Sequence, residues 1–101
     1  MASLALYAHL KAKPGKGAEV EAFLKSALPL AQAEAGTVNW YAFAEDGQNS
    51  FGIFDTFDTE AARQAHLDGP IAKALMARAG ELLAEPPAIH KIRLIADKGH
   101  G

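Results

Sequence analysis

Apolar and polar residues alternate strictly over the first part of the chain. Across residues 3–12 every second side chain is apolar, so four side chains share one face of an extended backbone: Leu4, Leu6, Ala8 and Leu10. This period of two is typical of a β-strand with one buried face. Residues 13–17, with the sequence KPGKG, follow and predict a turn.

The spacing of the apolar residues changes to that of a helix at Ala18. They now recur three and four residues apart, as the buried stripe of an amphipathic helix requires: Val20, Phe23, Leu24, Ala27, Leu28 and Ala31. Glu19 and Glu21 lie in the first turn, where acidic side chains favour a helix N-terminus. Gly36 is of a residue type that commonly follows a helix, so we predict one long helix that ends there.

The middle of the chain predicts a β-hairpin. Residues 37–45 and 50–57 are rich in aromatic and β-branched types, which favour strands, and residues 46–49 between them predict the turn.

A second helix is predicted to begin with a cap at Asp58 or Thr59 and to run to about Leu67. Residues 68–70, with the sequence DGP, interrupt it. The helical spacing resumes over residues 71–83, and residues 88–96 predict a last strand.

The predicted order β-α-β-β-α-β is that of the ferredoxin-like α+β fold. In this fold class the four strands form one antiparallel sheet and both helices pack on one of its faces. We expect a single domain over residues 1–101, with its core over about 3–96 and a loose tail over 97–101.

Both faces of the predicted sheet are apolar, although two helices can cover only one of them. In the second strand, for example, Val38 and Trp40 point to one side and Tyr41 and Phe43 to the other. An exposed apolar face of this kind usually marks an interface. We therefore predict a homodimer whose sheets pack face to face.

The composition limits the possible partners and chemistry. Half of the 101 residues are hydrophobic, and the net charge of −2 makes nucleic acid a poor partner. The chain has no cysteine, which excludes a disulfide scaffold, a thiolate nucleophile and a cysteine-based metal site. No apolar run reaches the ~20 residues of a membrane span, and no charged leader precedes an apolar stretch. We therefore expect no membrane partner and a cytoplasmic location.

No motif of a common enzyme class is present, which leaves the histidines as candidate chemical groups. The spacing of the four does not predict a metal site: His9, His66, His90 and His100. His66 precedes the helix interruption, so we expect it to point under the helix toward the sheet. It could be a buried histidine that holds the helix to a strand, or a general base in a cleft.

Asp55 is the second candidate. It is a carboxylate between Phe54 and Phe57 in a strand with two apolar faces, so it requires a partner. The sequence offers four: His66, Arg63, Lys91 and Arg93. A pair with His66 would orient the imidazole and raise its basicity, whereas a pair with an arginine would be structural.

Several segments resemble the antibiotic biosynthesis monooxygenase domain family, over nearly the whole chain. They are KPGKG at 13–17, AEAGT at 33–37, FDTF at 54–57 and AARQAHL at 61–67. The most specific elements are Asp55 and Phe57 at the end of the third strand and the alanine-flanked His66 on the following helix. The resemblance implies ferredoxin-like protomers that form a dimeric α/β barrel.

The resemblance also implies several possible activities. Some members oxygenate phenols or quinols with O₂ and use neither metal nor flavin, some degrade haem, and many have no assigned reaction. Haem-degrading members carry a tryptophan about where His66 stands and an iron-ligating histidine further along, where this chain has Met76 and no histidine nearby. We therefore expect no haem and no other cofactor.

In the cofactor-independent branch, a cleft deprotonates an electron-rich phenol and shields the anion from water while O₂ reacts. His66 would be the base or the partner of the anion, and Asp55 would orient it. The candidate substrate-binding residues are Trp40, Tyr7 and Asn39, although strand parity lets only one of Trp40 and Asn39 face this cleft.

Two hypotheses follow for the chain as a whole. The leading one is a homodimeric monooxygenase that acts on a quinol or polyketide-type aromatic. The competing one is a non-catalytic dimer of the same fold that binds a small molecule or has a structural role.

Overall fold

The computed structural model describes residues 3–46 and 49–99. Along this part of the chain the elements are β1 (Leu4–Lys11), α1 (Gly17–Ala33), β2 (Thr37–Ala44), β3 (Ser50–Phe57), α2 (Glu60–Leu67), α3 (Pro70–Leu82) and β4 (Ala88–Arg93). The predicted interruption of the second helix separates α2 from α3. Positions 47 and 48 of the predicted hairpin turn lie outside the described residues.

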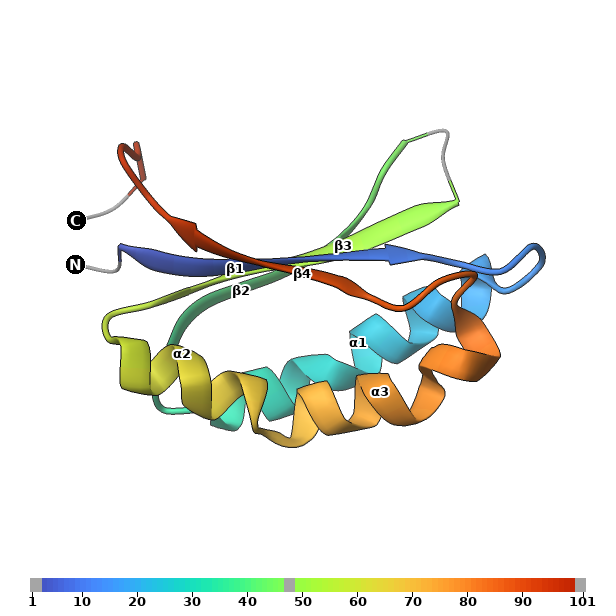
Figure 1. Ribbon diagram of the computed structural model, residues 1–101, viewed down its shortest axis with the longest axis horizontal. Helices are drawn as coiled ribbons and strands as arrows, with labels where there is room; N and C mark the ends of the chain where they lie inside the picture. Colours follow the sequence, from blue (N-terminus) through green and yellow to red (C-terminus); the bar gives the residue numbers. More distant parts are fainter. Residues whose placement is uncertain (1–2, 47–48, 100–101) are drawn as a thin grey trace.

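The four strands form one antiparallel sheet in the order β2-β3-β1-β4. All three helices lie on the same face of this sheet (Figure 1). This is the ferredoxin-like α+β arrangement, so the predicted fold class is confirmed. None of these helices is long and apolar enough to cross a membrane.

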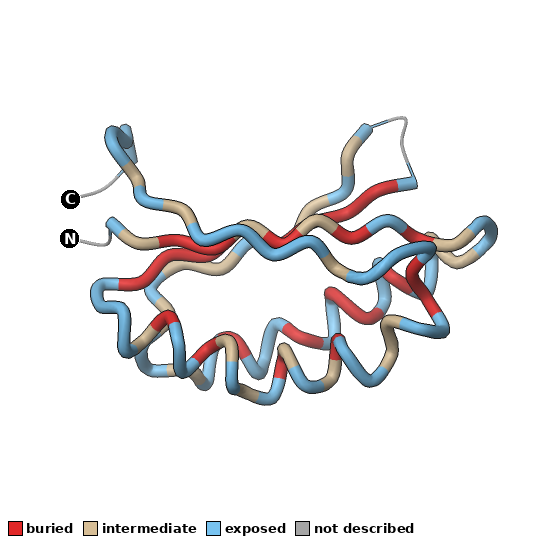
Figure 2. The backbone as a smooth tube through the Cα atoms, in the orientation of Figure 1, coloured by how far each residue is buried: buried red, intermediate tan, exposed pale blue. Residues whose placement is uncertain are grey.

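The core lies between the sheet and the helices, where buried positions line the facing sides of both layers (Figure 2). On β1, the alternation places Leu6, Ala8 and Leu10 toward the helices, as predicted. Ala8 and Leu10 belong to one buried cluster with residues of the helices, among them Val20 of α1 and Leu75 of α3. The two central strands, β1 and β3, therefore supply the buried side of the sheet, whereas no residue of β2 or β4 is fully buried.

One predicted boundary is wrong. β4 ends at Arg93 instead of residue 96, and Ile95 beyond it is 85% exposed. α1 ends at Ala33, just before Gly36 as predicted, and Glu34 adopts an extended backbone conformation (φ −81°, ψ 107°). This end of α1 matters for the site, since it places the Glu34 side chain beside α2.

The sheet face away from the helices, which we call the open face, carries a row of rings. Tyr7 lies nearly parallel to Phe43 (ring centroids 6.2 Å apart, 6° between planes) and to His90 (5.7 Å, 17°). Phe43 reaches across β3 because Gly52 has no side chain: a Cβ there would lie 2.3 Å from the Phe43 ring. The open face thus carries a row of stacked rings along its middle, as the aromatic residues of the strand patterns predict.

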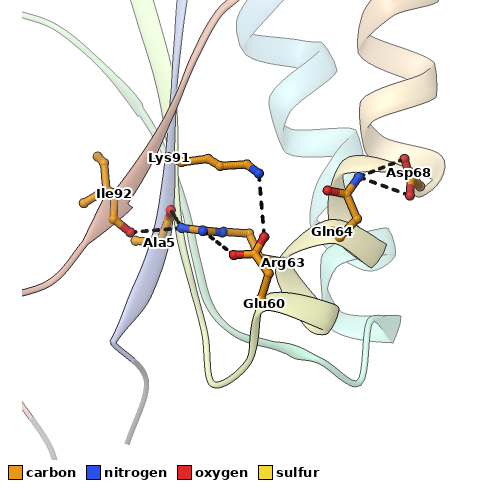
Figure 3. A network of polar contacts seen from close by, with 7 residues as sticks. All are labelled: Ala5, Glu60, Arg63, Gln64, Asp68, Lys91 and Ile92. Carbon is orange, nitrogen blue, oxygen red and sulfur yellow. Dashed lines mark hydrogen bonds and ion pairs between the residues drawn. The ribbon is translucent and has the colours of Figure 1, made fainter.

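Arg63 fastens α2 to the sheet (Figure 3). Its buried guanidinium donates through Nη1 to the backbone oxygens of Ala5 in β1 and Ile92 in β4, each at 3.2 Å. Its Nη2 pairs with Glu60, which also lies 3.7 Å from the ammonium group of Lys91. Arg63 is therefore bound to strand backbone and to Glu60, and is not the partner of Asp55.

Candidate functional site

His66 points from α2 under the helix toward the sheet, as the sequence predicts. Thr59 caps α2 by accepting a hydrogen bond from the backbone N–H of Ala62 (3.1 Å), and His66 near the other end is only 8% exposed. Its Nε2 lies 2.9 Å from Oδ2 of Asp55, which is 1% exposed. Of the four candidate partners, His66 is the one that the structure brings to this carboxylate.

A third residue, Glu34, completes what we call the acid–imidazole cluster of Glu34, Asp55 and His66. Glu34 Oε1 lies 2.7 Å from His66 Nδ1 and accepts a hydrogen bond from Thr37 Oγ1 at 2.8 Å. The sequence analysis missed Glu34, because a glutamate close to a helix end usually faces solvent.

The two carboxylates determine the charge of His66. Burial alone would lower the pKa of the imidazole, but the close contacts with the carboxylates of Asp55 and Glu34 outweigh burial and raise this pKa to about 8. At neutral pH His66 is therefore mainly a cation between two carboxylates. In this arrangement neither ring nitrogen is free to accept a proton from a substrate.

We expect the stability of the folded chain to fall as the pH rises through the pKa of His66. Because this pKa is raised from 6.5 to about 8 on folding, the folded chain retains a proton that the unfolded chain releases. The contribution, roughly 2 kcal/mol, is complete below pH 6.5 and is lost as the pH passes about 8. Urea unfolding at pH 6 and pH 9 measures it. A His66→Gln variant should lack most of this loss, and an equal loss in both proteins would assign it to other groups.

Four buried polar atoms of the cluster and of Trp40 have no aligned hydrogen-bond partner among the described residues. They are Oε2 of Glu34, both carboxylate oxygens of Asp55 and Nε1 of Trp40. The short His66–Asp55 contact is therefore an ion pair in which the N–H is not aimed at the oxygen. Trp40 lies directly opposite Asp55 in the β2–β3 pairing, so both side chains share the face that meets the helices.

An apolar cleft of about 470 Å³ lies between α1 and the edge strand β2. Its size falls within the range of small-molecule sites. Mostly apolar residues of α1, β2 and β3 line it together with two exposed charged residues of α1: Leu24, Leu28, Trp40, Tyr41, Ala42, Phe43, Ala44, Phe51, Glu21 and Lys25. His66 and Asp55 do not line this cleft, but Trp40 both lines it and neighbours Asp55.

The structure places Tyr7 and Asn39 on the open face. There Tyr7 stacks on Phe43, and Asn39 Oδ1 accepts a hydrogen bond from Thr56 Oγ1 at 2.9 Å. Neither lines the cleft, so of the three candidate substrate-binding residues only Trp40 lines it and lies on the side of His66.

Comparison with known proteins gives a family match over most of the chain. Residues 3–78 match the family described as antibiotic biosynthesis monooxygenase. Among curated protein sequences, no significant match was found.

Several solved structures are similar to this chain over almost its whole length. A protein of unknown function from Nitrosomonas europaea is 52% identical, with a TM-score of 0.93 over 100% of this chain and 97% of that one. A Mycobacterium tuberculosis protein is 20% identical, with a TM-score of 0.84 over 95% and 98% of the two chains. A candidate antibiotic biosynthesis monooxygenase from Caulobacter crescentus is 22% identical, with a TM-score of 0.78 over 94% and 92%. At these low identities, the last two similarities show a shared fold only.

Proposed function

Since the chain belongs to the antibiotic biosynthesis monooxygenase family, we propose that it is a cofactor-independent monooxygenase of a quinol or polyketide-type aromatic molecule. The observation that supports this proposal is the cleft between α1 and β2. Its walls are apolar, its volume of about 470 Å³ is sufficient for a fused-ring aromatic, and Trp40 joins it to the acid–imidazole cluster.

The proposed reaction balances with O₂ as the only oxidant. A quinol and one O₂ give a hydroxyquinone and one water, so one oxygen atom enters the ring and the other leaves as water. Four electrons pass from the substrate to O₂. The chain would supply a dry site in which the phenolate forms and is protected from water while it reacts.

Asp55 and His66 can have their proposed catalytic roles only if side chains of the acid–imidazole cluster move. Trp40 stands between the cleft and Asp55, and His66 is held by a carboxylate at each nitrogen. A substrate proton could reach His66 only if one carboxylate releases it. The Trp40 side chain is therefore the part of the site on which the proposal depends most.

Oxygen uptake tests the proposed activity. We expect the protein to consume O₂ with hydroquinones of one, two or three fused rings faster than the same solutions without protein or with heat-denatured protein. Mass spectrometry with ¹⁸O₂ should place one labelled oxygen atom in the product. Uptake equal to spontaneous oxidation with every compound would contradict the proposal.

One observation favours the competing function, a non-catalytic dimer that binds a small molecule. Both nitrogens of His66 are engaged by carboxylates, which suits a structural role that holds α2 to β3 and to the end of α1. In that case hydroquinones would bind without any increase in O₂ uptake. Binding measured by calorimetry under nitrogen separates the two functions.

We also propose that the chain forms a homodimer through the open face, so that two sheets enclose the row of rings and the pair forms a barrel. Light scattering at micromolar concentration should give twice the mass of the chain. Phe54 lies opposite Tyr7 on this face, so a Phe54→Lys variant should be monomeric. The control is Met76→Lys, since Met76 is 60% exposed on α3. A monomeric wild-type protein would overturn the proposal.

A further inference from the structure

We propose that Trp40 is a positioning residue that couples the cleft to the acid–imidazole cluster: a ligand that enters the cleft turns the indole so that its Nε1–H donates to Asp55. The inference rests on the proposed function of the cleft as a binding site for aromatic molecules. Through Trp40, the binding of a ligand in the cleft would affect the protonation of His66, which does not itself line the cleft.

The first support is a buried donor without a partner beside a carboxylate that accepts no aligned hydrogen bond. Nε1 of Trp40 and Oδ1 of Asp55 are buried without a hydrogen-bond partner among the described residues, whereas Oδ2 of Asp55 forms the ion pair with His66. Unpartnered polar atoms in the interior are unfavourable, so an arrangement that pairs them is favoured. Trp40 and Asp55 are directly opposite each other on paired strands, which places their Cβ atoms about 5 Å apart.

The second support is that the indole is the least enclosed of the three side chains. Asp55 is 1% exposed in a central strand, and His66 is held at both ring nitrogens. Trp40 packs on the core with one part of its side chain but is only partly buried, and it belongs to β2, an edge strand of the sheet that the described residues form. The cleft lies against one side of the indole and provides the room for the turn.

The coupling has a chemical consequence for His66. An indole N–H on Asp55 would satisfy part of the charge of this carboxylate and so weaken its hold on the imidazolium. His66 would then release its proton at a lower pH when the cleft is occupied than when it is empty. Substrate binding would itself bring the imidazole closer to the state in which it can accept a proton.

The test uses the indole N–H as its probe. Trp40 is the only tryptophan of the chain, so the indole N–H gives one cross-peak in a ¹H–¹⁵N spectrum. Under nitrogen, 1-naphthol should shift the methyl resonances of Leu24 and Leu28, which line the cleft, and should move the indole proton downfield. In Asp55→Asn, whose amide oxygen is a weaker acceptor, the indole shift should fall at least twofold. The control Asp97→Asn, an exposed carboxylate near the C-terminus, should retain it.

A second measurement follows His66 directly. Its imidazole resonances, titrated with and without 1-naphthol, should show a lower midpoint with the ligand in the wild-type protein. A Trp40→Phe variant keeps an aromatic ring but lacks the donor, so the midpoint should then be the same with and without naphthol. A role of Trp40 limited to packing predicts no such difference between the two proteins.

The outcomes separate this inference from the proposed function. If naphthol shifts the leucine methyl resonances but leaves the indole proton or the His66 midpoint unchanged, the coupling is wrong and the cleft remains a binding site. If naphthol shifts none of these resonances, the cleft does not bind this class of aromatic molecule. Both the coupling through Trp40 and the proposed function of the cleft are then wrong.

Discussion

Replacing His66 with alanine is expected to lower the free energy of unfolding by about 3 kcal/mol, because it leaves two carboxylates without the cation between them. Asp55 is almost fully buried and Glu34 is partly buried, so water cannot fully replace the imidazolium. The change also removes a side chain that packs on the Phe57 ring, with centroids 5.4 Å apart. Urea unfolding at pH 6, where the cluster contributes fully, measures the loss.

The control for this variant is Gln64→Ala, since Gln64 is exposed on the same helix. We expect it to change the unfolding free energy by less than about 0.5 kcal/mol. A loss below about 1 kcal/mol for His66→Ala would mean that the cluster contributes little to stability. If His66→Ala unfolds with nearly the wild-type free energy but no longer increases O₂ uptake, His66 has a catalytic role and not a structural one.

Filling the cleft is expected to have the largest effect on ligand binding. Ala42 lines the cleft from β2 and is exposed, so Ala42→Trp places an indole in the binding space without disturbing the core. We expect the affinity for hydroquinones to fall roughly 100-fold or more, since overpacking a site costs up to about 3 kcal/mol. Calorimetry under nitrogen and O₂ uptake should change together.

A tryptophan elsewhere on the surface is the matched control for the filled cleft. Ala61 is exposed on α2 and away from the cleft lining, so Ala61→Trp should bind hydroquinones as the wild-type protein does. Unchanged affinity in Ala42→Trp would show that the ligand binds elsewhere, and O₂ uptake would then have to be assigned to another site.

The fold was largely predictable because the chain has two clear periodicities. The alternation in β1 and the helical stripe of α1 each identify one element type, and the DGP segment separates α2 from α3. The need of Asp55 for a partner was also predictable, since a carboxylate in a two-sided apolar strand requires one, but the sequence left His66 as one of four candidates, and the structure selects it.

The remaining parts of the site depend on where helices end and on which face of the sheet is open. Glu34 joins the cluster because it directly follows the last residue of α1, and although Gly36 indicates this helix end, no local signal in the sequence shows that the Glu34 side chain turns toward α2. Tyr7 and Asn39 are aromatic and amide residues suited to a pocket, but their parity places them on the open face. The cleft itself arises from the distance between α1 and an edge strand, which periodicity does not report.

Gly52 has a consequence for how this protein can change over evolution or in the laboratory. The Phe43 ring occupies the space where a Cβ at position 52 would be, so any larger residue displaces that ring from Tyr7. Positions 43, 52 and 7 can therefore be substituted only in compatible sets, although they belong to three different strands. A search for variants with altered self-association should therefore randomise these three positions together, because a single substitution disrupts the packing of the rings without providing a new one.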